Sequence, residues 1–352
     1  MSFERTTPCG VISGTACQWP GIAAYKGIRY ATAGRWEFPV PVTHWDGVYD
    51  ATQYGACCYQ PRAFYDEAAA PGKAFYYNEF RKGETYTYSE DCLFLNIWAP
   101  ADAAPGDRLP VIFYIHGGGF VAGDKHYRRG LARWAANKGF FVVNVNYGLG
   151  PKDLFPKGIQ HLVHALNWVG ENAEKYNLDL DNMCVSGDSA GGYYSAMLAC
   201  VSTNKALQER FGVETNLRFR TAMLDCGIYD VGEALGQKMP FNLTDKVLVD
   251  FSGIHVKDLD NYEYRDVMAP FDFVDATFPI SFVTYAEKDM FCKGQGQKLV
   301  AKLKDLGVHV EEHHSTTFLD NHCYPLNWNK GAAKENIRLC DDFLARVVKK
   351  EV

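Results

Sequence analysis

From about residue 108 to the C-terminus, short apolar runs alternate with segments in which apolar residues recur at helical spacing. The predicted strands are 111–115, 140–145, 183–186, 221–224, 280–285 and a last one that begins at 308. The predicted helices are 130–138, 159–176, 191–201, 297–306 and 334–348. Because this alternation is typical of βαβ units, we expect an α/β fold with a mostly parallel central sheet and helices on both of its faces.

Two segments interrupt the alternation. Residues 1–107 contain short β-like pieces and many turn residues, and residues 227–278 contain no clear strand. No linker separates either segment from the rest, so we expect one domain over residues 1–352 with a β-rich N-terminal part. Ligands of open α/β sheets bind beyond the carboxyl ends of the strands, so we predict that 227–278 forms a small cap over a site. A surface excursion without a role is the alternative.

The segment 187–192, Gly-Asp-Ser-Ala-Gly-Gly, directly follows a predicted strand and opens a predicted helix. In that context Gly-x-Ser-x-Gly is typical of a nucleophile elbow, a sharp turn that exposes the serine hydroxyl above the sheet. We therefore predict that Ser189 is a nucleophile, and that Gly187 and Gly191 keep side chains away from it.

A glycine-rich loop can supply hydrogen-bond donors for the negative charge that develops on the carbonyl oxygen when the nucleophile attacks. The sequence His-Gly-Gly-Gly-Phe at 116–120 follows a predicted strand. We predict an oxyanion hole formed by the backbone N–H groups of Gly117, Gly118 and Ala190. We expect His116 to brace this loop, because a base beside the oxyanion donors would point at the wrong atom.

Two further residues follow the nucleophile in the order acid and then base, which is the chain order of these hydrolases. Asp289 lies four residues after the predicted strand 280–285, and His322 lies in a loop before the last predicted helix. We predict that Asp289 orients His322, which takes the Ser189 proton and later returns it to the leaving group.

Neighbouring titratable residues are competitors for these roles. His313 and His314 end the pattern of the last strand, so we expect them to be sheet or surface residues rather than the base. Glu287 and Asp320 could support Asp289 and His322, but we expect both to be solvated surface charges. The two adjacent histidines lack the clustered ligands of a metal site, and we expect no metal or cofactor.

Composition narrows the classes of partner. The net charge is −6 without a Lys/Arg cluster, which argues against nucleic-acid binding. No apolar stretch approaches the ~18 residues of a membrane span, and the N-terminus lacks the pattern of a secretory signal, so we expect a cytoplasmic protein. The 11 cysteines are scattered without a Cys-x-x-Cys pair, and we expect free thiols.

These motifs resemble two neighbouring families of α/β hydrolases. The segments 116–120, 146–151 (Asn-Tyr-Gly-Leu-Gly-Pro) and 187–192 resemble the hormone-sensitive-lipase family of esterases. The N-terminal third resembles the type-B carboxylesterases at 25–31, at 45–48 and above all at 89–98, Ser-Glu-Asp-Cys-Leu-Phe-Leu-Asn-Ile-Trp. The resemblance implies an α/β-hydrolase fold and the cleavage of carboxylic esters through an acyl-enzyme.

The chain departs from the type-B pattern in several places. It is much shorter, and it has Asp188 and Asp289 where type-B enzymes typically have glutamate. Cys58 and Cys92 stand where the resemblance to secreted members implies a disulfide, and we expect both to be reduced in the cytoplasm. Substrate preferences of animal carboxylesterases therefore do not carry over.

The expected function is that of a serine carboxylic-ester hydrolase whose partner is a small to medium ester with a short-chain or aromatic acyl group. The same three residues could instead cleave amides or thioesters or transfer the acyl group, and a non-catalytic ligand-binding protein is a remote alternative. Residues 64–88 contain eight aromatic side chains. They are interpreted either as a pocket wall for flat apolar substrates or as packing of the N-terminal part over the core.

Overall fold

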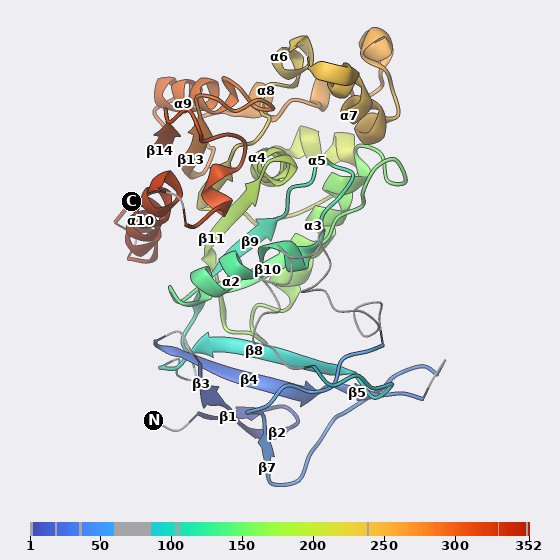
Figure 1. Cartoon of the computed structure of the whole chain (residues 1–352), viewed down its shortest axis with the longest axis vertical. Helices are drawn as coiled ribbons and strands as arrows, with labels where there is room; N and C mark the ends of the chain where they lie inside the picture. The colour runs from blue at the N-terminus through green and yellow to red at the C-terminus, as the bar shows by residue number, and fades with distance from the viewer. Residues whose placement is uncertain are drawn as a thin grey trace. The chain divides into compact units, whose positions relative to one another are not determined.

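The computed structural model divides the chain into two compact units, Met1–Ala104 and Pro105–Val352 (Figure 1). The structure describes residues 3–17, 20–34, 37–59, 86–102, 104, 106–237, 239–329, 331–349 and 351–352. In that part of the chain, no helix has the length and apolar character needed to cross a membrane.

The first unit consists of short strands that surround a small apolar core. One sheet has the order β1-β2-β7 and a second the order β3-β4-β8, while β5 and β6 form a separate pair. The strands are β1 (Glu4–Thr7), β2 (Gly10–Ser13), β3 (Thr15–Ala16), β4 (Ile22–Arg29), β5 (Ala31–Thr32), β6 (Val40–Pro41), β7 (Val48–Asp50) and β8 (Phe94–Pro100). The core contains Ile12, Ala23, Tyr25, Ile28 and Ala51.

The second unit is built on one six-stranded sheet with the order β10-β9-β11-β12-β13-β14. Every neighbouring pair in it is parallel, which confirms the expected parallel central sheet. The strands are β9 (Leu109–Ile115), β10 (Phe141–Val145), β11 (Leu178–Asp188), β12 (Thr221–Asp225), β13 (Ile280–Ala286) and β14 (Val310–Ser315).

Helices cover both faces of this sheet because successive side chains of a buried strand point to opposite sides. On β9, Phe113 and Ile115 pack in the larger apolar core, which includes α3 (Lys157–Glu171), α4 (Ala190–Thr203) and α9 (Gln295–Asp305). The intervening Ile112 and Tyr114 pack in a second core with α2 (Arg129–Ala136) and α10 (Gly331–Val348). Both faces of β9 are therefore apolar, which explains why its sequence is a continuous apolar run.

Several elements differ from the predictions, among them β11, which is longer at both ends than the predicted strand 183–186. The helix α5 (Lys205–Phe211) was not predicted; the Asn204 side chain accepts from Leu207 N at its start, and Gly212 ends it with a left-handed backbone. The helix α3 ends at Glu171 rather than at 176, and residues 172–177 form turns before β11. The last strand begins at Val310 rather than 308, and it is an edge strand, so its polar residues carry little periodic signal.

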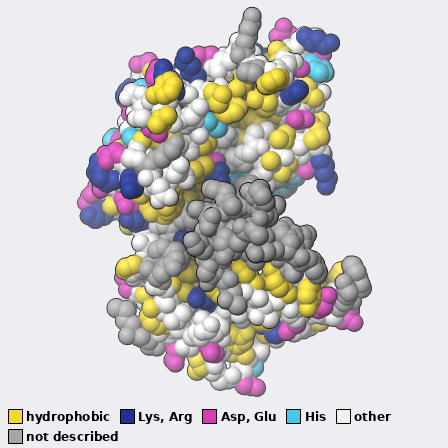
Figure 2. All heavy atoms as spheres, in the orientation of Figure 1, with side chains coloured by type: hydrophobic (Ala, Val, Ile, Leu, Met, Phe, Trp, Pro, Cys, Tyr) yellow, Lys and Arg dark blue, Asp and Glu magenta, His cyan; other side chains and the backbone are white. Residues whose placement is uncertain are grey.

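Residues 227–278 fold into short helices between β12 and β13. These are α6 (Val231–Gly236), η3 (Pro240–Asn242), α7 (Leu243–Ser252), η4 (Val256–Asn261), η5 (Arg265–Val267) and α8 (Pro270–Phe273). The Asp230 side chain caps α6 by accepting a hydrogen bond from Glu233 N. On the face drawn in Figure 2, hydrophobic side chains gather over α6 and α7, and Phe241 is 91% exposed.

Candidate active site

Ser189 occupies the sharp turn between β11 and α4. Its φ of 55° lies in the left-handed region, which is strained for a residue with a side chain. The backbone N–H of Ser189 donates to Asp225 O at 2.8 Å, which ties the turn to the end of the neighbouring strand β12. The structure thus places Ser189 at the carboxyl edge of the sheet, in the turn that the Gly-x-Ser-x-Gly pattern predicts.

The glycines on either side allow the chain to pass through this turn. A Cβ atom built on Gly191 would lie 1.9 Å from Ile115 O, and one built on Gly187 would lie 2.5 Å from Gly191 O. Both contacts are with backbone atoms of the buried centre of the fold, which have no room to move away. Only glycine fits at either position.

We expect Gly191→Ala to lower the free energy of unfolding by about 1–3 kcal/mol, because the added methyl group overpacks the turn. Gly130→Ala is a matched control, since Gly130 also lies in a helix but a Cβ there meets nothing within 4 Å. That control should be neutral or slightly stabilising. Urea denaturation of both variants measures the difference, and equal midpoints would contradict the packing argument.

Ser189, His322 and Asp289 form a continuous chain of hydrogen bonds. Ser189 Oγ lies 2.8 Å from His322 Nε2, and His322 Nδ1 lies 2.9 Å from Asp289 Oδ2 and 3.1 Å from Oδ1. Asp289 is 1% exposed, and its Oδ1 also accepts hydrogen bonds from the N–H groups of Phe291 and Cys292. The structure brings together all three residues that the sequence predicts, with the separation that proton transfer needs.

The electrostatic surroundings of His322 favour the charged ring. Burial lowers the pKa of His322, but hydrogen bonds to Asp289, Cys292 and Cys323 outweigh burial, so the pKa is raised above its usual value. An imidazolium at this position is therefore stabilised. That is the state His322 would reach after it accepts a proton from Ser189.

Asn321 joins the loops that carry the acid and the base, and it was not predicted. Its side-chain Oδ1 accepts hydrogen bonds from Met290 N at 3.0 Å and from His322 N at 2.7 Å. One amide oxygen thus holds the residues next to Asp289 and His322 in a fixed relation. In the sequence, the feature that could have drawn attention to Asn321 is its position directly before His322.

The glycine loop after β9 lies against the turn of Ser189. A Cβ on Gly117 would meet Ser189 Cβ at 3.1 Å, and Gly118 and Ala190 line the same pocket as Ser189. Gly118 has a φ of +124°, a backbone conformation that glycine adopts readily and residues with a side chain rarely adopt. The three residues predicted to hold an oxyanion therefore lie around the serine, while that role stays a prediction.

His116 is buried beneath this loop. Its Nδ1 lies 2.7 Å from Gly117 O, its ring stacks on Tyr147 with 4.5 Å between centroids, and Tyr147 Oη donates to His116 O. Burial lowers the pKa of His116, which favours the neutral ring. These contacts are those of a residue that braces the loop.

The competing residues have partners of their own. His313 Nδ1 lies 2.6 Å from Tyr324 Oη, and His314 Nε2 lies 3.0 Å from the carboxylate of Glu287, whose side chain is 44% exposed. For Asp320 the expectation of a solvated charge is wrong. The structure buries its carboxylate, which accepts a hydrogen bond from Ser315 Oγ at 2.6 Å.

An ion pair beneath the turn was missed by the sequence reasoning. Arg128, at the end of η2 (Lys125–Arg128), binds Asp188 through Nε at 2.9 Å and Nη2 at 2.6 Å. Tyr114 Oη donates to the same carboxylate at 2.7 Å. The Asp188 side chain is 1% exposed and that of Arg128 is 21% exposed. Because the partners lie 60 residues apart, no local pattern could have indicated the pair.

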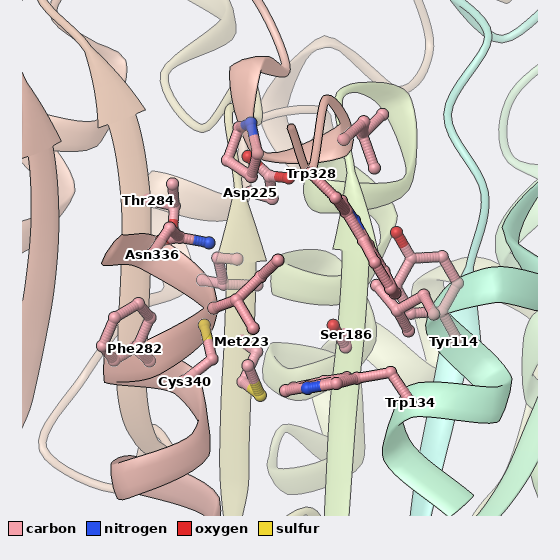
Figure 3. Close-up of a pocket in the computed structure, with 15 residues that line it drawn as sticks. Tyr114, Trp134, Ser186, Met223, Asp225, Phe282, Thr284, Trp328, Asn336 and Cys340 are labelled. Carbon is pink, nitrogen blue, oxygen red and sulfur yellow. The ribbon is translucent and has the colours of Figure 1, made fainter. Parts of the chain in front are cut away.

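A small cavity of about 60 Å³ lies on the α10 side of the sheet (Figure 3). It is lined in part by Tyr114, Ser186, Met223 and Asp225. Burial raises the pKa of Asp225 well above its usual range, so this carboxyl is expected to be neutral. Ser189 and His322 do not line this cavity. We therefore assign it no part in the site.

A larger pocket of about 470 Å³ opens at Ser189 and His322. The helices of residues 227–278 provide much of its wall, which is predominantly apolar. The residues from this segment are Ile228, Val231, Ala234, Leu235, Met239, Leu243, Thr244, Val247, Leu248 and Phe251. A pocket of this size and character suits an apolar group of a small ligand. The prediction of an aromatic wall at 64–88 falls largely on residues 60–85, which lie outside the described residues.

Comparisons with known proteins bear on both fold and family. The profile of the "Carboxylesterase family" matches residues 2–213, and a profile described as "alpha/beta hydrolase fold" matches residues 112–319. Para-nitrobenzyl esterase of Bacillus subtilis (strain 168) is 34% identical over 227 residues, which cover 60% of this chain and 43% of that protein. Carboxylesterase 1D of Mus musculus is 30% identical over 216 residues, covering 58% and 37%. The chain spans about two fifths of the length of these curated relatives.

Solved structures confirm the expected fold. An inhibited esterase B from Lactobacillus rhamnosis superimposes with a TM-score of 0.62 at 22% identity, covering 74% of this chain and 83% of that one. A bacterial heroin esterase gives a TM-score of 0.59 at 23% identity, covering 71% and 78%. At these identities the likeness establishes the α/β-hydrolase fold, which the sequence motifs predict.

Proposed function

The chain belongs to the carboxylesterase family, and from this premise we propose that it is a serine carboxylic-ester hydrolase acting on small to medium esters. The observation that supports the proposal most strongly is the hydrogen-bonded chain of Asp289, His322 and Ser189 at an apolar pocket. A serine hydroxyl is a weak nucleophile, and a base that a carboxylate orients is the arrangement that activates it.

In the proposed reaction, Ser189 Oγ attacks the ester carbonyl while His322 Nε2 takes its proton. The N–H groups of Gly117, Gly118 and Ala190 stabilise the oxyanion of the tetrahedral intermediate. The imidazolium, held by Asp289, then gives the proton to the departing alcohol. A water molecule activated by His322 hydrolyses the acyl-enzyme and restores Ser189.

The apolar pocket supports an ester that carries an uncharged group of moderate length. The lining from α6 and α7 is mostly aliphatic, and Phe251 of α7 and Phe291 add aromatic surface. Each CH₂ group that moves from water into such a lining contributes about 0.8 kcal/mol. We propose that this pocket binds the acyl chain of the substrate and limits its length.

We expect Val247→Phe to shift the preference toward shorter acyl groups, because Val247 lines the pocket and the larger ring occupies part of it. The ratio of kcat/KM for p-nitrophenyl octanoate to that for the acetate should fall about tenfold, the effect of roughly one misfitting methylene. Val249→Phe is the control: it lies on the same helix, and its side chain is absent from the pocket wall. The same shift in both variants would contradict the proposed acyl site.

Hydrolysis of a p-nitrophenyl series from acetyl to decanoyl, with benzoyl as the aromatic member, tests the proposed function. We expect turnover that rises with chain length and then falls at the limit of the pocket. Preferential cleavage of matched amides or thioesters, or transfer of the acyl group to an added alcohol instead of water, would overturn the assignment as an ester hydrolase. Absence of turnover on every member would also overturn it.

A further inference from the structure

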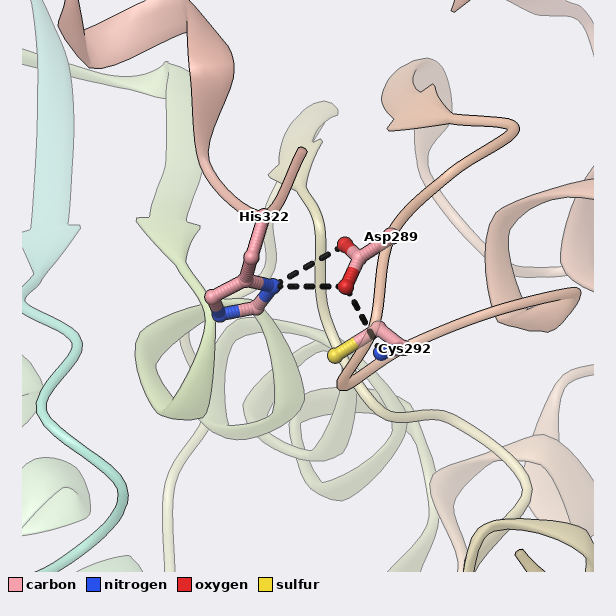
Figure 4. A group of neighbouring side chains, drawn as sticks. All are labelled: Asp289, Cys292 and His322. Carbon is pink, nitrogen blue, oxygen red and sulfur yellow. Dashed lines mark hydrogen bonds and ion pairs between the residues drawn. The ribbon is translucent and has the colours of Figure 1, made fainter. Parts of the chain in front are cut away.

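A third side chain, besides those in the hydrogen-bonded chain, approaches the pair of acid and base. Cys292 Sγ, an oxygen of Asp289 and a ring nitrogen of His322 all lie within 4.8 Å of one another (Figure 4). Asp289 and Cys292 are buried, and His322 is partly buried. The Cys292 thiol forms and breaks no bond in the proposed ester hydrolysis, and the figure shows it directed toward the imidazole.

We infer that Asp289, Cys292 and His322 bind Zn²⁺ or a cation of similar softness, and that the bound ion switches the site off. A thiolate, an imidazole nitrogen and a carboxylate oxygen are the three ligand types that zinc prefers in proteins. Around a tetrahedral zinc, such atoms lie about 3.5 Å apart. His322 Nδ1 and Asp289 Oδ2 already lie 2.9 Å apart, so small side-chain movements complete the arrangement.

Charge and access both favour a divalent cation at this position. One thiolate and one carboxylate together carry two negative charges, which neutralise Zn²⁺ in a buried site. His322 and Cys292 line the pocket of about 470 Å³, so an ion can reach them through the same opening as the substrate. The fourth position is left for water, as in zinc sites with three protein ligands.

Binding of the ion would stop the proposed reaction because His322 could no longer accept the proton of Ser189. This inhibition rests on the proposed function. An ion on Nδ1 takes the lone pair of that nitrogen, so the neutral ring carries its proton on Nε2. Nε2 then cannot accept the proton of Ser189. The proton balance is complete: in the neutral ring the proton moves from Nδ1 to Nε2, in the imidazolium the Nδ1 proton is released to solvent, and in both cases the Cys292 thiol releases one proton as it becomes a thiolate.

Titration with Cd²⁺ tests the site without relying on catalysis, because a cadmium–thiolate bond produces an ultraviolet charge-transfer band. We expect one tight Cd²⁺ per chain in the wild type and in Ser189→Ala. Affinity should fall by more than about tenfold in Cys292→Ala. His322→Ala removes a second ligand and keeps the test valid if Cys292→Ala does not fold. Cys9→Ala, in the first unit, is a control for loss of a thiol elsewhere and should leave the affinity unchanged.

Zn²⁺ inhibition provides the second readout. Esterase turnover should fall on titration with Zn²⁺ and return with EDTA, and Cys292→Ala should need more than about tenfold higher Zn²⁺ for the same fractional loss of its own rate. Equal Cd²⁺ affinity in the wild type and Cys292→Ala would overturn the site. Tight binding at these ligands with undiminished turnover would overturn the switch. If no ester is cleaved, the proposed function fails while the Cd²⁺ titration still decides whether the ion binds.

Discussion

Ser189→Ala is expected to lower kcat/KM for p-nitrophenyl butyrate by about 10⁴-fold or more, while the protein remains folded. Loss of the nucleophile from a serine triad removes nearly all the catalysis that the triad supplies, because its members act as a unit. Ser189 is held in its turn by backbone contacts, namely its N–H to Asp225 O and the close approach of Gly191 to Ile115. Removing one hydroxyl group leaves these contacts in place.

Ser195→Ala is the matched control for this variant. Ser195 lies on the same helix, is fully buried, and its Oγ has no hydrogen-bond partner among the described residues. We expect its rate to stay within about threefold of the wild type, since removal of an unsatisfied hydroxyl is close to neutral. Circular dichroism and the Tm establish that both variants are folded. Near-normal turnover in Ser189→Ala would remove the nucleophile assignment.

Arg128→Met is expected to lower the free energy of unfolding by about 3 kcal/mol. The change removes both guanidinium hydrogen bonds from Asp188, whose carboxylate stays buried and, among the residues that the structure describes, keeps the hydrogen bond from Tyr114 Oη. An uncompensated buried charge is far more costly than the pair itself was stabilising. Urea denaturation measures the loss.

The double variant Arg128→Met with Asp188→Asn separates this explanation from a general loss of packing. Replacing the carboxylate by a neutral amide removes the unpaired charge, so the double variant should recover more than half of the stability lost in Arg128→Met. If Arg128→Met alone lies within about 0.5 kcal/mol of the wild type, the ion pair is not the stabilising contact that its geometry indicates. No recovery in the double variant would assign the loss to packing.

The residues that the sequence could predict are those that lie next to a recognisable element. Ser189 and Asp289 each follow a buried strand, and His322 follows the last strand after a longer loop; parallel strands end at one edge of the sheet, so local patterns could predict that they lie together. The central strands could also be predicted, because both faces of the sheet are covered by helices and these strands are therefore continuous apolar runs.

The residues that sequence reasoning missed depend on contacts between distant parts of the chain. Arg128 and Asp188 lie 60 residues apart in the chain, and Cys292 and His322 lie in two separate loops that the tertiary fold brings together. Asp320 lies in the loop after β14, and its carboxylate is buried where it accepts a hydrogen bond from Ser315 Oγ. Such partners have no periodic signal, because the contact is set by the tertiary fold and not by spacing.

The segment 227–278 is inserted in the chain between β12 and β13, whereas Ser189 follows β11 and His322 follows β14. Only Asp289 follows a strand that borders the insertion, and it lies beyond that strand's far end. The segment that shapes the ligand pocket is therefore a module with its own two attachment points. Evolution, or recombination in the laboratory, could exchange this module for one of another length and so diversify the accepted ligands while the reacting groups keep their positions.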